Sequence, residues 1–262
     1  MKKYLFPNII VFSISLLILY SIYPQASLAA SPNLENAGKS KSSHAMTLSE
    51  LADKYPQFFV MHGSSASPRV SLTFDDAPDP RFTPQILDIL KKYHVNATFF
   101  IVGYRAKAYP ELTKRIVREG HALGNHSYNH AYLPKLTLPQ FSQQIIHTQQ
   151  VIQQISGYTP KLIRPPYGEI NEQQLVWAIE RHFRIVNWNV DSLDWKSLAY
   201  QDVVHNIIDD VRPGSIILQH AGGGVGEDLS GTIQALPIII TKLQQKGYSF
   251  VTVPSLLKIE SK

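Results

Sequence analysis

Residues 70–76 have the sequence VSLTFDD, in which a short apolar and β-branched run ends in two adjacent carboxylates, Asp75 and Asp76. Such a run is typical of a buried strand. Further runs of this kind follow along the chain, at residues 97–102, 122–124, 162–164, 184–188, 215–219 and 249–253. The chain is therefore expected to contain several short strands in regular succession.

Segments with helical periodicity separate these runs. They cover residues 83–93, 110–119, 138–155, 172–181, 201–211 and 232–246. Gly120 and Gly247 stand where two of the helices should end. Alternation of strands and helices implies a parallel sheet with right-handed crossovers. About seven such units in one run predict an α/β fold, a distorted (β/α) barrel, rather than an open doubly wound sheet.

Chemistry in such barrels lies at the carboxyl ends of the strands. The expected strand ends carry ionisable or aromatic residues. These are Asp75 and Asp76, then His126 and His130, then Arg164 and Tyr167, then Asp191 and Trp195, and finally His220. The sequence therefore predicts that these side chains gather at one edge of the sheet.

A metal site is the first chemistry that this edge could support. His126 and His130 are four residues apart, so one turn could direct both imidazoles at a single ion. Adjacent carboxylates repel each other unless a cation compensates them. One aspartate and two histidines would hold a divalent ion and leave coordination positions open. The chain has no cysteine, so any metal must be held by His, Asp or Glu.

General acid and base groups are available at the same edge. The aspartate that does not bind the ion could act as a general base on water, and Arg164 is the best partner to orient it. His220 is a candidate general acid. We expect Asp191 to hold it protonated, because a nearby carboxylate raises the pKa of an imidazole.

Five stretches carry a family resemblance. TFDDAP at 73–78, HSYNH at 126–130, RPPYG at 164–168, DSLDW at 191–195 and LQH at 218–220 resemble, in order, the motifs of the polysaccharide deacetylases. These are the NodB-homology enzymes of carbohydrate esterase family 4, and the likeness covers about residues 68–258. It implies a metal-dependent hydrolase that removes N-acetyl groups from N-acetylglucosamine in peptidoglycan or a chitin-like polymer.

Two alternatives to that function stay open. One is an O-deacetylase of acetylated xylan, which uses nearly the same chemistry. The other is a non-catalytic, wall-associated protein that keeps the fold. A pseudoenzyme normally lacks a base or a ligand, and this sequence lacks neither.

The resemblance implies a role for each carboxylate and imidazole at the metal. Asp75 resembles the catalytic base. Asp76, His126 and His130 resemble the ligands of one divalent ion, usually Zn²⁺ in this family, with Co²⁺ or another divalent ion as alternatives. Ala77 stands where the family usually has glycine, and we expect at most an adjusted turn there.

The remaining motif residues are matched in the same way. Arg164 is similar to the arginine that holds the base, and the backbone N–H of Tyr167 to a group that binds the oxyanion. Asp191 matches the carboxylate that tunes the general acid His220. The walls of the pocket for the acetyl methyl group correspond to Trp195 and Leu218.

The amino terminus resembles a secretory signal. Lys2 and Lys3 precede an apolar stretch at 9–20 and small residues at 25–30, which predicts a signal peptide over residues 1–30 or an uncleaved membrane anchor. Residues 31–67 are interpreted as a flexible tether and lead-in, and residues 68–258 as the catalytic domain. The chain is expected outside the cytoplasm, secreted or associated with the cell wall or membrane of a bacterium.

The net charge is modest, +5 from 25 basic and 20 acidic residues. No Lys/Arg run interleaved with aromatic residues is present, so we do not expect nucleic acid as a partner. The expected partner is the polysaccharide substrate. Membrane contact is expected only if the N-terminal segment stays uncleaved, and we expect a monomer.

Overall fold

The structure is a computed structural model that describes residues 46–259. The predicted signal peptide or anchor and the predicted tether up to residue 45 lie outside the described residues. Within residues 46–259, none of the helices has both the length and the apolar character needed to cross a membrane.

The described residues form one strongly curled parallel sheet. Its strands are β1 (Phe59–Val60), β2 (Arg69–Ala77), β3 (Thr98–Ile101), β4 (Ala122–Asn125), β5 (Leu162–Ile163), β6 (Arg184–Val186), β7 (Val190–Asp191), β8 (Ile216–His220) and β9 (Ser249–Phe250). The order is β1-β6-β5-β4-β3-β2-β8-β7, and β9 pairs with β2 beside this path. All of these pairings are parallel. The predicted distorted (β/α) barrel is confirmed, with eight strands along the curled path where about seven were predicted.

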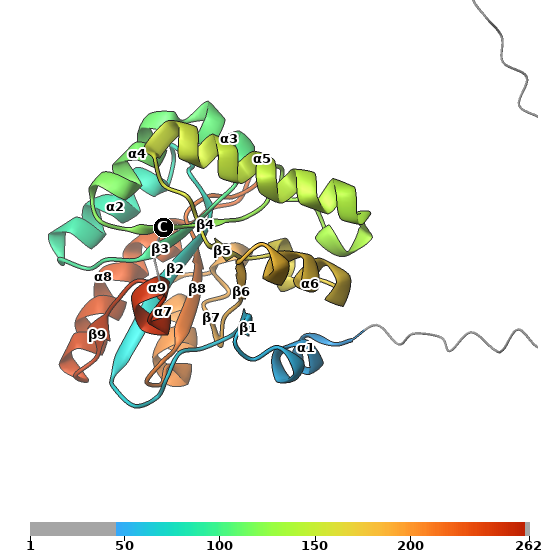
Figure 1. The fold of residues 1–262 in the computed structure, drawn as a ribbon. Coiled ribbons are helices and arrows are strands. Elements are labelled where there is room, and N and C mark those ends of the chain that lie inside the picture. The colour runs from blue at the N-terminus through green and yellow to red at the C-terminus, as the bar shows by residue number, and fades with distance from the viewer. Residues whose placement is uncertain (1–45, 260–262) are drawn as a thin grey trace, which may run out of the picture. The chain divides into compact units, whose positions relative to one another are not determined.

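Helices surround this sheet (Figure 1). They are α1 (Leu48–Lys54), α2 (Thr83–Lys92), α3 (Gly103–Ala108), α4 (Pro110–Arg118), α5 (Leu138–Ser156), α6 (Glu172–Glu180), α7 (Tyr200–Asp210), α8 (Ser230–Gln245) and α9 (Val253–Leu257). Three short 3-10 turns follow strands: η1 (Leu133–Lys135), η2 (Pro166–Gly168) and η3 (Asp194–Lys196). Left-handed glycines follow α4 and α8 as predicted, with φ of 86° at Gly120 and 82° at Gly247.

The alternation of side chains along β2 explains how the site is supported. Successive side chains of a strand point to opposite faces of the sheet. Leu72 and Phe74 pack in the largest core cluster, which the sheet shares with α2, α7 and α8. Thr73 and Asp75 face the other way, and both contact Arg164 inside the curled sheet. The strand that builds the core therefore also presents a carboxylate to the interior.

Helix α9 covers the amino-terminal ends of the strands. Val253 and Leu256 of α9 pack against Phe100 and Ile216 in a separate buried cluster. The backbone N–H of Val253 donates to the Thr98 hydroxyl at 2.9 Å. Figure 1 shows α9 in front of the sheet in that view. The carboxyl ends of the strands, where the motifs lie, are at the opposite end.

Residues 46–67 are part of the same folded unit. The side chains of Leu51 in α1 and Phe59 in β1 are buried, and β1 pairs with β6. Thr47 and Glu50 cap α1 reciprocally. The sequence pattern predicts only a lead-in ahead of the catalytic domain for these residues, because a strand as short as β1 shows no periodicity. The structure adds α1 and β1 to the barrel.

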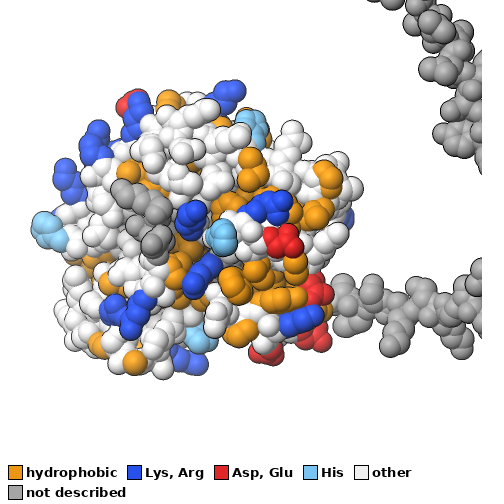
Figure 2. All heavy atoms as spheres, viewed as in Figure 1, with side chains coloured by type: hydrophobic (Ala, Val, Ile, Leu, Met, Phe, Trp, Pro, Cys, Tyr) orange, Lys and Arg blue, Asp and Glu red, His pale blue; other side chains and the backbone are white. Residues whose placement is uncertain are grey.

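Basic side chains are spread over the face seen in Figure 2. They are separated there by uncharged surface and do not merge into one continuous patch.

Candidate active site

Arg164 holds Asp75 in the interior of the sheet. Its Nη1 donates to Asp75 Oδ1 at 2.8 Å and to the Thr73 hydroxyl at 2.8 Å. Its remaining N–H groups donate to the carbonyls of Val186 and Asn187 at 3.0 and 3.1 Å. Arg164 is fully buried, and Asp75 is nearly so. The arginine thus occupies one oxygen of the carboxylate and leaves Oδ2 directed toward His126, whose Nε2 is 3.6 Å away.

Asp76, His126 and His130, the three ligands that the family resemblance implies, converge at one point. Asp76 Oδ1 lies 3.5 Å from His130 Nε2 and 3.8 Å from His126 Nε2. The three potential ligand atoms all lie within 4.8 Å of one another. One carboxylate and two imidazoles at this separation suit a divalent cation with open coordination positions.

The surroundings of both imidazoles suit metal binding. The Nδ1 of His126 lies 2.7 Å from the carbonyl oxygen of Arg164, which can only accept, so Nδ1 donates and the Nε2 lone pair faces Asp76. Burial is the largest cause that lowers the pKa of His130 and favours its neutral form. A neutral imidazole is the form that binds a metal. The residues present therefore fit a divalent cation.

Left-handed backbone conformations cluster at these loops. Asp76, Ser127, His130, Tyr167 and Leu193 all have φ between 55° and 64°. Each non-glycine residue in a sparsely populated region costs about 1–3 kcal/mol, and such residues concentrate at functional sites. The left-handed conformations of the turns that carry the predicted ligands are therefore stabilised by tertiary contacts, because the residues themselves do not favour them.

Arg105 anchors two of these loops to each other. Its guanidinium donates to the carbonyl of Asp76 at 2.9 Å and to the carbonyl of Gly223 at 2.8 Å. A side chain at Gly222 would place its Cβ 2.3 Å from the Asp76 carbonyl oxygen. The glycine-rich loop after β8 is thus pinned on the loop that carries Asp76. Arg105 was not predicted as a site residue, because α3 is too short to show helical periodicity.

His220 pairs with Asp194, so the predicted pairing with Asp191 is wrong. Asp194 Oδ1 lies 2.7 Å from His220 Nδ1, and Asp194 Oδ2 accepts from the His220 backbone N–H at 2.9 Å and from Thr232 at 2.8 Å. Burial lowers the pKa of His220, but the charge of Asp194 and its hydrogen bond, with the charges of Asp75 and Asp76, outweigh burial and raise the pKa to about 9.

The turn after β7 explains why Asp194, and not Asp191, pairs with His220. Leu193 has a φ of 55°, which reverses the chain between the two aspartates. Asp194 is consequently buried beneath His220, whereas Asp191 lines the open cavity and accepts from the Leu193 N–H at 2.8 Å. Burial raises the pKa of Asp191. Asp191 is the last residue of β7 and Asp194 lies three residues later, so spacing alone did not distinguish them.

One cavity of about 350 Å³ collects most of the predicted site. It is lined by Asp76, His126, His130, Tyr167, Trp188, Asp191, Trp195, His220 and Glu227. Trp188 and Glu227 were missed, since one lies just beyond β6 and the other in an irregular loop. Leu218, predicted as a pocket wall, is buried in β8 and is not among the lining side chains.

Comparison with known sequences finds a family model described as polysaccharide deacetylase, which matches residues 62–184. A peptidoglycan-N-acetylglucosamine deacetylase of Bacillus cereus is 44% identical over 226 residues, covering 86% of this chain and 81% of the relative. A peptidoglycan-N-acetylmuramic acid deacetylase of Bacillus subtilis is 40% identical over 192 residues, covering 73% of this chain but only 39% of the relative.

Solved structures agree with these matches. A peptidoglycan N-acetylglucosamine deacetylase in complex with a benzamide compound has a TM-score of 0.77 and 44% identity, covering 79% of this chain and 96% of that one. A family 4 acetyl xylan esterase from Clostridium thermocellum, in complex with a cobalt ion, has a TM-score of 0.65 and 35% identity, covering 72% and 89%.

Proposed function

Because the chain belongs to the polysaccharide deacetylase family, we propose that it hydrolyses the N-acetyl amide of N-acetylglucosamine in a cell-wall polysaccharide and releases acetate. One observation carries the proposal. Asp76, His126, His130 and His220 line a single open cavity, while the buried Asp75 lies 3.6 Å from His126 and the buried Asp194 pairs with His220.

Asp76, His126 and His130 would hold one divalent cation, for which Zn²⁺ is our first choice and Co²⁺ the second. When bound, the cation supplies Lewis acidity toward the acetyl carbonyl and the attacking water. Asp75 accepts the proton of that water through Oδ2, since Arg164 occupies Oδ1. The Tyr167 N–H is proposed to donate to the developing oxyanion.

His220 completes the reaction as general acid. An amide nitrogen is a poor leaving group and must be protonated as the C–N bond breaks. His220 lines the cavity, and its Nδ1 is engaged by Asp194, so Nε2 is the atom that can donate. A pKa of about 9 keeps this proton in place near neutral pH.

The two alternative functions are less well supported. The acetyl xylan esterase is the more distant of the structures described above, at 35% identity against 44%. A non-catalytic protein would have no need for a complete set of acid, base and cation ligands, and all of these groups are present here. We therefore place N-deacetylation of a wall polymer first.

The location of the chain follows from that substrate. We infer that it acts outside the cytoplasm, because its polymeric substrate is assembled there and residues 1–30 have the pattern of an export signal. Fractionation of expressing cells, with N-terminal sequencing of the mature protein, checks both parts.

Acetate release tests the function directly. The purified chain is assayed on peptidoglycan, chitooligosaccharides and acetylxylan, after chelation and after addition of Zn²⁺ or Co²⁺. We expect cation-dependent acetate release that is fastest on the N-acetylated polymers. Faster release from acetylxylan would favour the esterase, and no release from any polymer would favour the non-catalytic alternative.

A further inference from the structure

Residues 126–130, called here the ligand turn, have a backbone conformation that they do not favour by themselves. Ser127 and His130 have φ of 64° and 58°, in the left-handed region that non-glycine residues rarely adopt. His126 and His130 nevertheless bring their ring nitrogens close enough together to share one cation. Contacts from other parts of the fold must therefore fix the ligand turn.

Helix α5 contacts the middle of the ligand turn through Gln144. The Oε1 atom of Gln144 accepts from the backbone N–H groups of Tyr128 and Asn129, at 2.9 and 3.2 Å. Both of these residues lie between the two histidines. Because the amide nitrogen can only donate, the two N–H groups also determine which end of the Gln144 amide faces the ligand turn. One side chain thus binds two successive peptide groups between the histidines.

Two further contacts join α5 to the ligand turn. Asn125 Nδ2 donates to the carbonyl of Ile145 at 2.8 Å, while Asn125 Oδ1 accepts from the Ser127 N–H at 3.0 Å. The Tyr128 ring stacks on the His147 ring, with centroids 4.1 Å apart and planes at 11°. The α5 residues in all of these contacts are consecutive or nearly so. The ligand turn is therefore docked on one short stretch of this helix.

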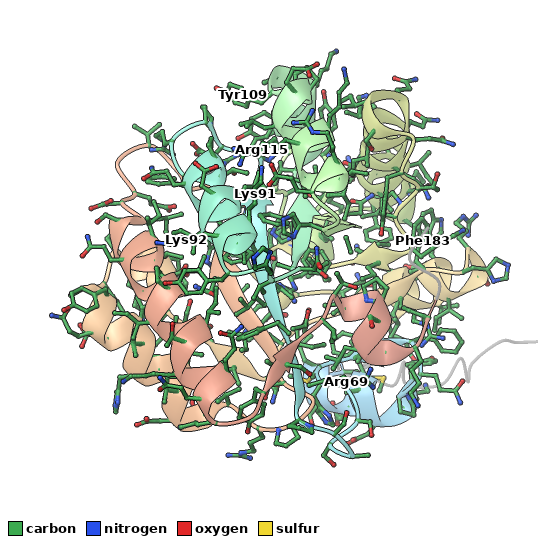
Figure 3. The ribbon with its side chains drawn as sticks, turned by 90° about the vertical axis from the view of Figure 1, so that its left-hand side faces the viewer. Arg69, Lys91, Lys92, Tyr109, Arg115 and Phe183 are labelled. Atoms are coloured by element: carbon green, nitrogen blue, oxygen red, sulfur yellow. The ribbon has the colours of Figure 1, made fainter. Side chains whose placement is uncertain are left out.

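Helix α5 is a firm support for such contacts. It is 19 residues long and packs against α3 and α4, and Figure 3 shows it beside α4, the helix that carries Arg115. Its buried side chains join both of the large core clusters, Ile145 in one and Ile152 in the other. A side chain on a packed helix is held more precisely than one on a loop. Gln144 can thus define the position of the ligand turn.

We propose that Gln144 is a positioning residue that sets the separation of the His126 and His130 imidazoles and thereby the affinity of the cation site. The inference rests on the proposed cation-dependent function and adds α5 to that site. Gln144 is not among the described residues that line the cavity, so it acts through the ligand turn. Without its acceptor oxygen, two backbone N–H groups would lose their partner and the ligand turn could relax. Residues that orient metal ligands contribute about 10- to 100-fold to metal affinity.

The test is cation affinity, measured on the purified chain by titration calorimetry with Zn²⁺ and with Co²⁺. Gln144→Met keeps the length of the side chain and removes the acceptor oxygen, whereas Gln144→Glu keeps an acceptor at the same place. Gln143→Met is the matched control, because Gln143 is the neighbouring glutamine of α5 and its side chain is exposed.

We expect Gln144→Met to weaken the binding of both cations by about tenfold. Gln144→Glu and Gln143→Met should stay within about threefold of the wild type. The visible absorption spectrum of bound Co²⁺ reports the arrangement of its ligands, so this spectrum should change in Gln144→Met alone. A residue that served only the stability of the fold would leave the spectrum of the bound ion unchanged.

Wild-type affinity in Gln144→Met would overturn the inference, and so would an equal loss of affinity in Gln144→Glu or in Gln143→Met. Acetate release from peptidoglycan is measured on the same wild-type sample, so that the proposed function is tested separately. A wild type that binds the cations but releases no acetate would contradict the proposed function and leave the inference intact. A wild type that binds neither cation would overturn both together.

Discussion

Arg164 links the chemistry of the site to the stability of the barrel. It is the largest fully buried side chain in the described residues, and its guanidinium lies over the Phe100 ring, 4.0 Å from the centre. The same guanidinium binds Asp75 Oδ1. A buried carboxylate without this partner would be uncompensated, and breaking a buried ion pair from one side costs about 3–5 kcal/mol.

Replacement of Arg164 by lysine should therefore damage both properties. Lysine keeps a charge but cannot make the planar, multiply donating contact, so Asp75 would be misplaced. We expect Arg164→Lys to lower the free energy of unfolding by about 3 kcal/mol and kcat by about 100-fold. Urea unfolding and acetate release measure the two effects. Wild-type activity in this variant would show that Asp75 needs no partner.

The pH profile tests the corrected partner of His220. The acid must be protonated, and its pKa of about 9 means that activity falls as the pH rises through that region. A cation held by Asp76 repels the imidazolium, so the alkaline limb lies at or below pH 9. In Asp194→Asn, burial lowers the pKa without opposition from that carboxylate, and the alkaline limb should move to lower pH by at least about one unit.

Asp191→Asn is the comparison for that experiment. Asp191 lies in the cavity rather than against the His220 ring, so its variant should keep the alkaline limb near the wild-type position. If Asp191→Asn moved the limb and Asp194→Asn did not, the pairing seen in the structure would not be the one that operates in solution.

Single residues show how far sequence reasoning could go. The i, i+4 spacing of His126 and His130 and the acidic pair at a strand end predicted a site with one aspartate, the family resemblance named Asp76 as that aspartate, and the three side chains do converge. Which of Asp191 and Asp194 pairs with His220 depends on the left-handed backbone of Leu193 between them. A left-handed leucine cannot be predicted from the pattern of side chains. Arg105 was missed because it lies on the short helix α3, and its strongest contacts toward the site are to the backbone carbonyls of Asp76 and Gly223.

Among the elements, the longer strands and helices were predicted, and so were two strands of only two residues, β5 and β9. Each strand run predicted from residue 70 onward overlaps a strand of the structure, although the run at 249–253 has only Ser249 and Phe250 in β9, and its last residue, Val253, begins α9. Strands β1 and β7, with two residues each, and helices α3 and α9, with six and five, were not predicted, because segments this short show little periodicity of their own. Their positions depend on tertiary pairing and packing.

The contribution of α1 can be measured through Leu51. Its side chain is fully buried, and the cost of Leu→Ala at a buried site is about 2–5 kcal/mol. We expect Leu51→Ala to lower the free energy of unfolding by this amount, whereas Val225→Ala, at a fully exposed position, should have almost no effect. Equal stabilities for both variants would mean that residues 46–67 do not belong to the folded unit in solution.

The glycine-rich loop after β8 should influence cation binding. A Cβ at Gly222 would press on the Asp76 carbonyl and on Arg105, so Gly222→Ala should displace the ligand loop and weaken cation binding by about tenfold. Gly224→Ala is the control, because its Cβ would meet only the Glu227 side chain at 3.3 Å or more. Isothermal titration with Zn²⁺ measures both, and equal affinities would exclude a role for this contact.

At the scale of the folded unit, the reactive groups lie at one end of the barrel, and packed apolar side chains fill the other end. Helix α9 and its cluster cover the amino ends of the strands, while the cation ligands, the base and the acid stand at the carboxyl ends. This division follows from the parallel sheet, which brings the carboxyl ends of distant segments to one edge. Reactive groups that lie far apart along the chain are thereby held at one cavity.

The division of labour between Asp75 and Asp76 is the most direct test of this account. Cation affinity by titration calorimetry and acetate release are measured together on the wild type, Asp75→Asn and Asp76→Asn. We expect Asp75→Asn to keep cation affinity within about threefold and to lose nearly all activity, because an amide cannot accept the proton of water. Asp76→Asn should lose both. Cation loss in Asp75→Asn with retention in Asp76→Asn would contradict the assignment, and full activity in either variant would contradict the mechanism.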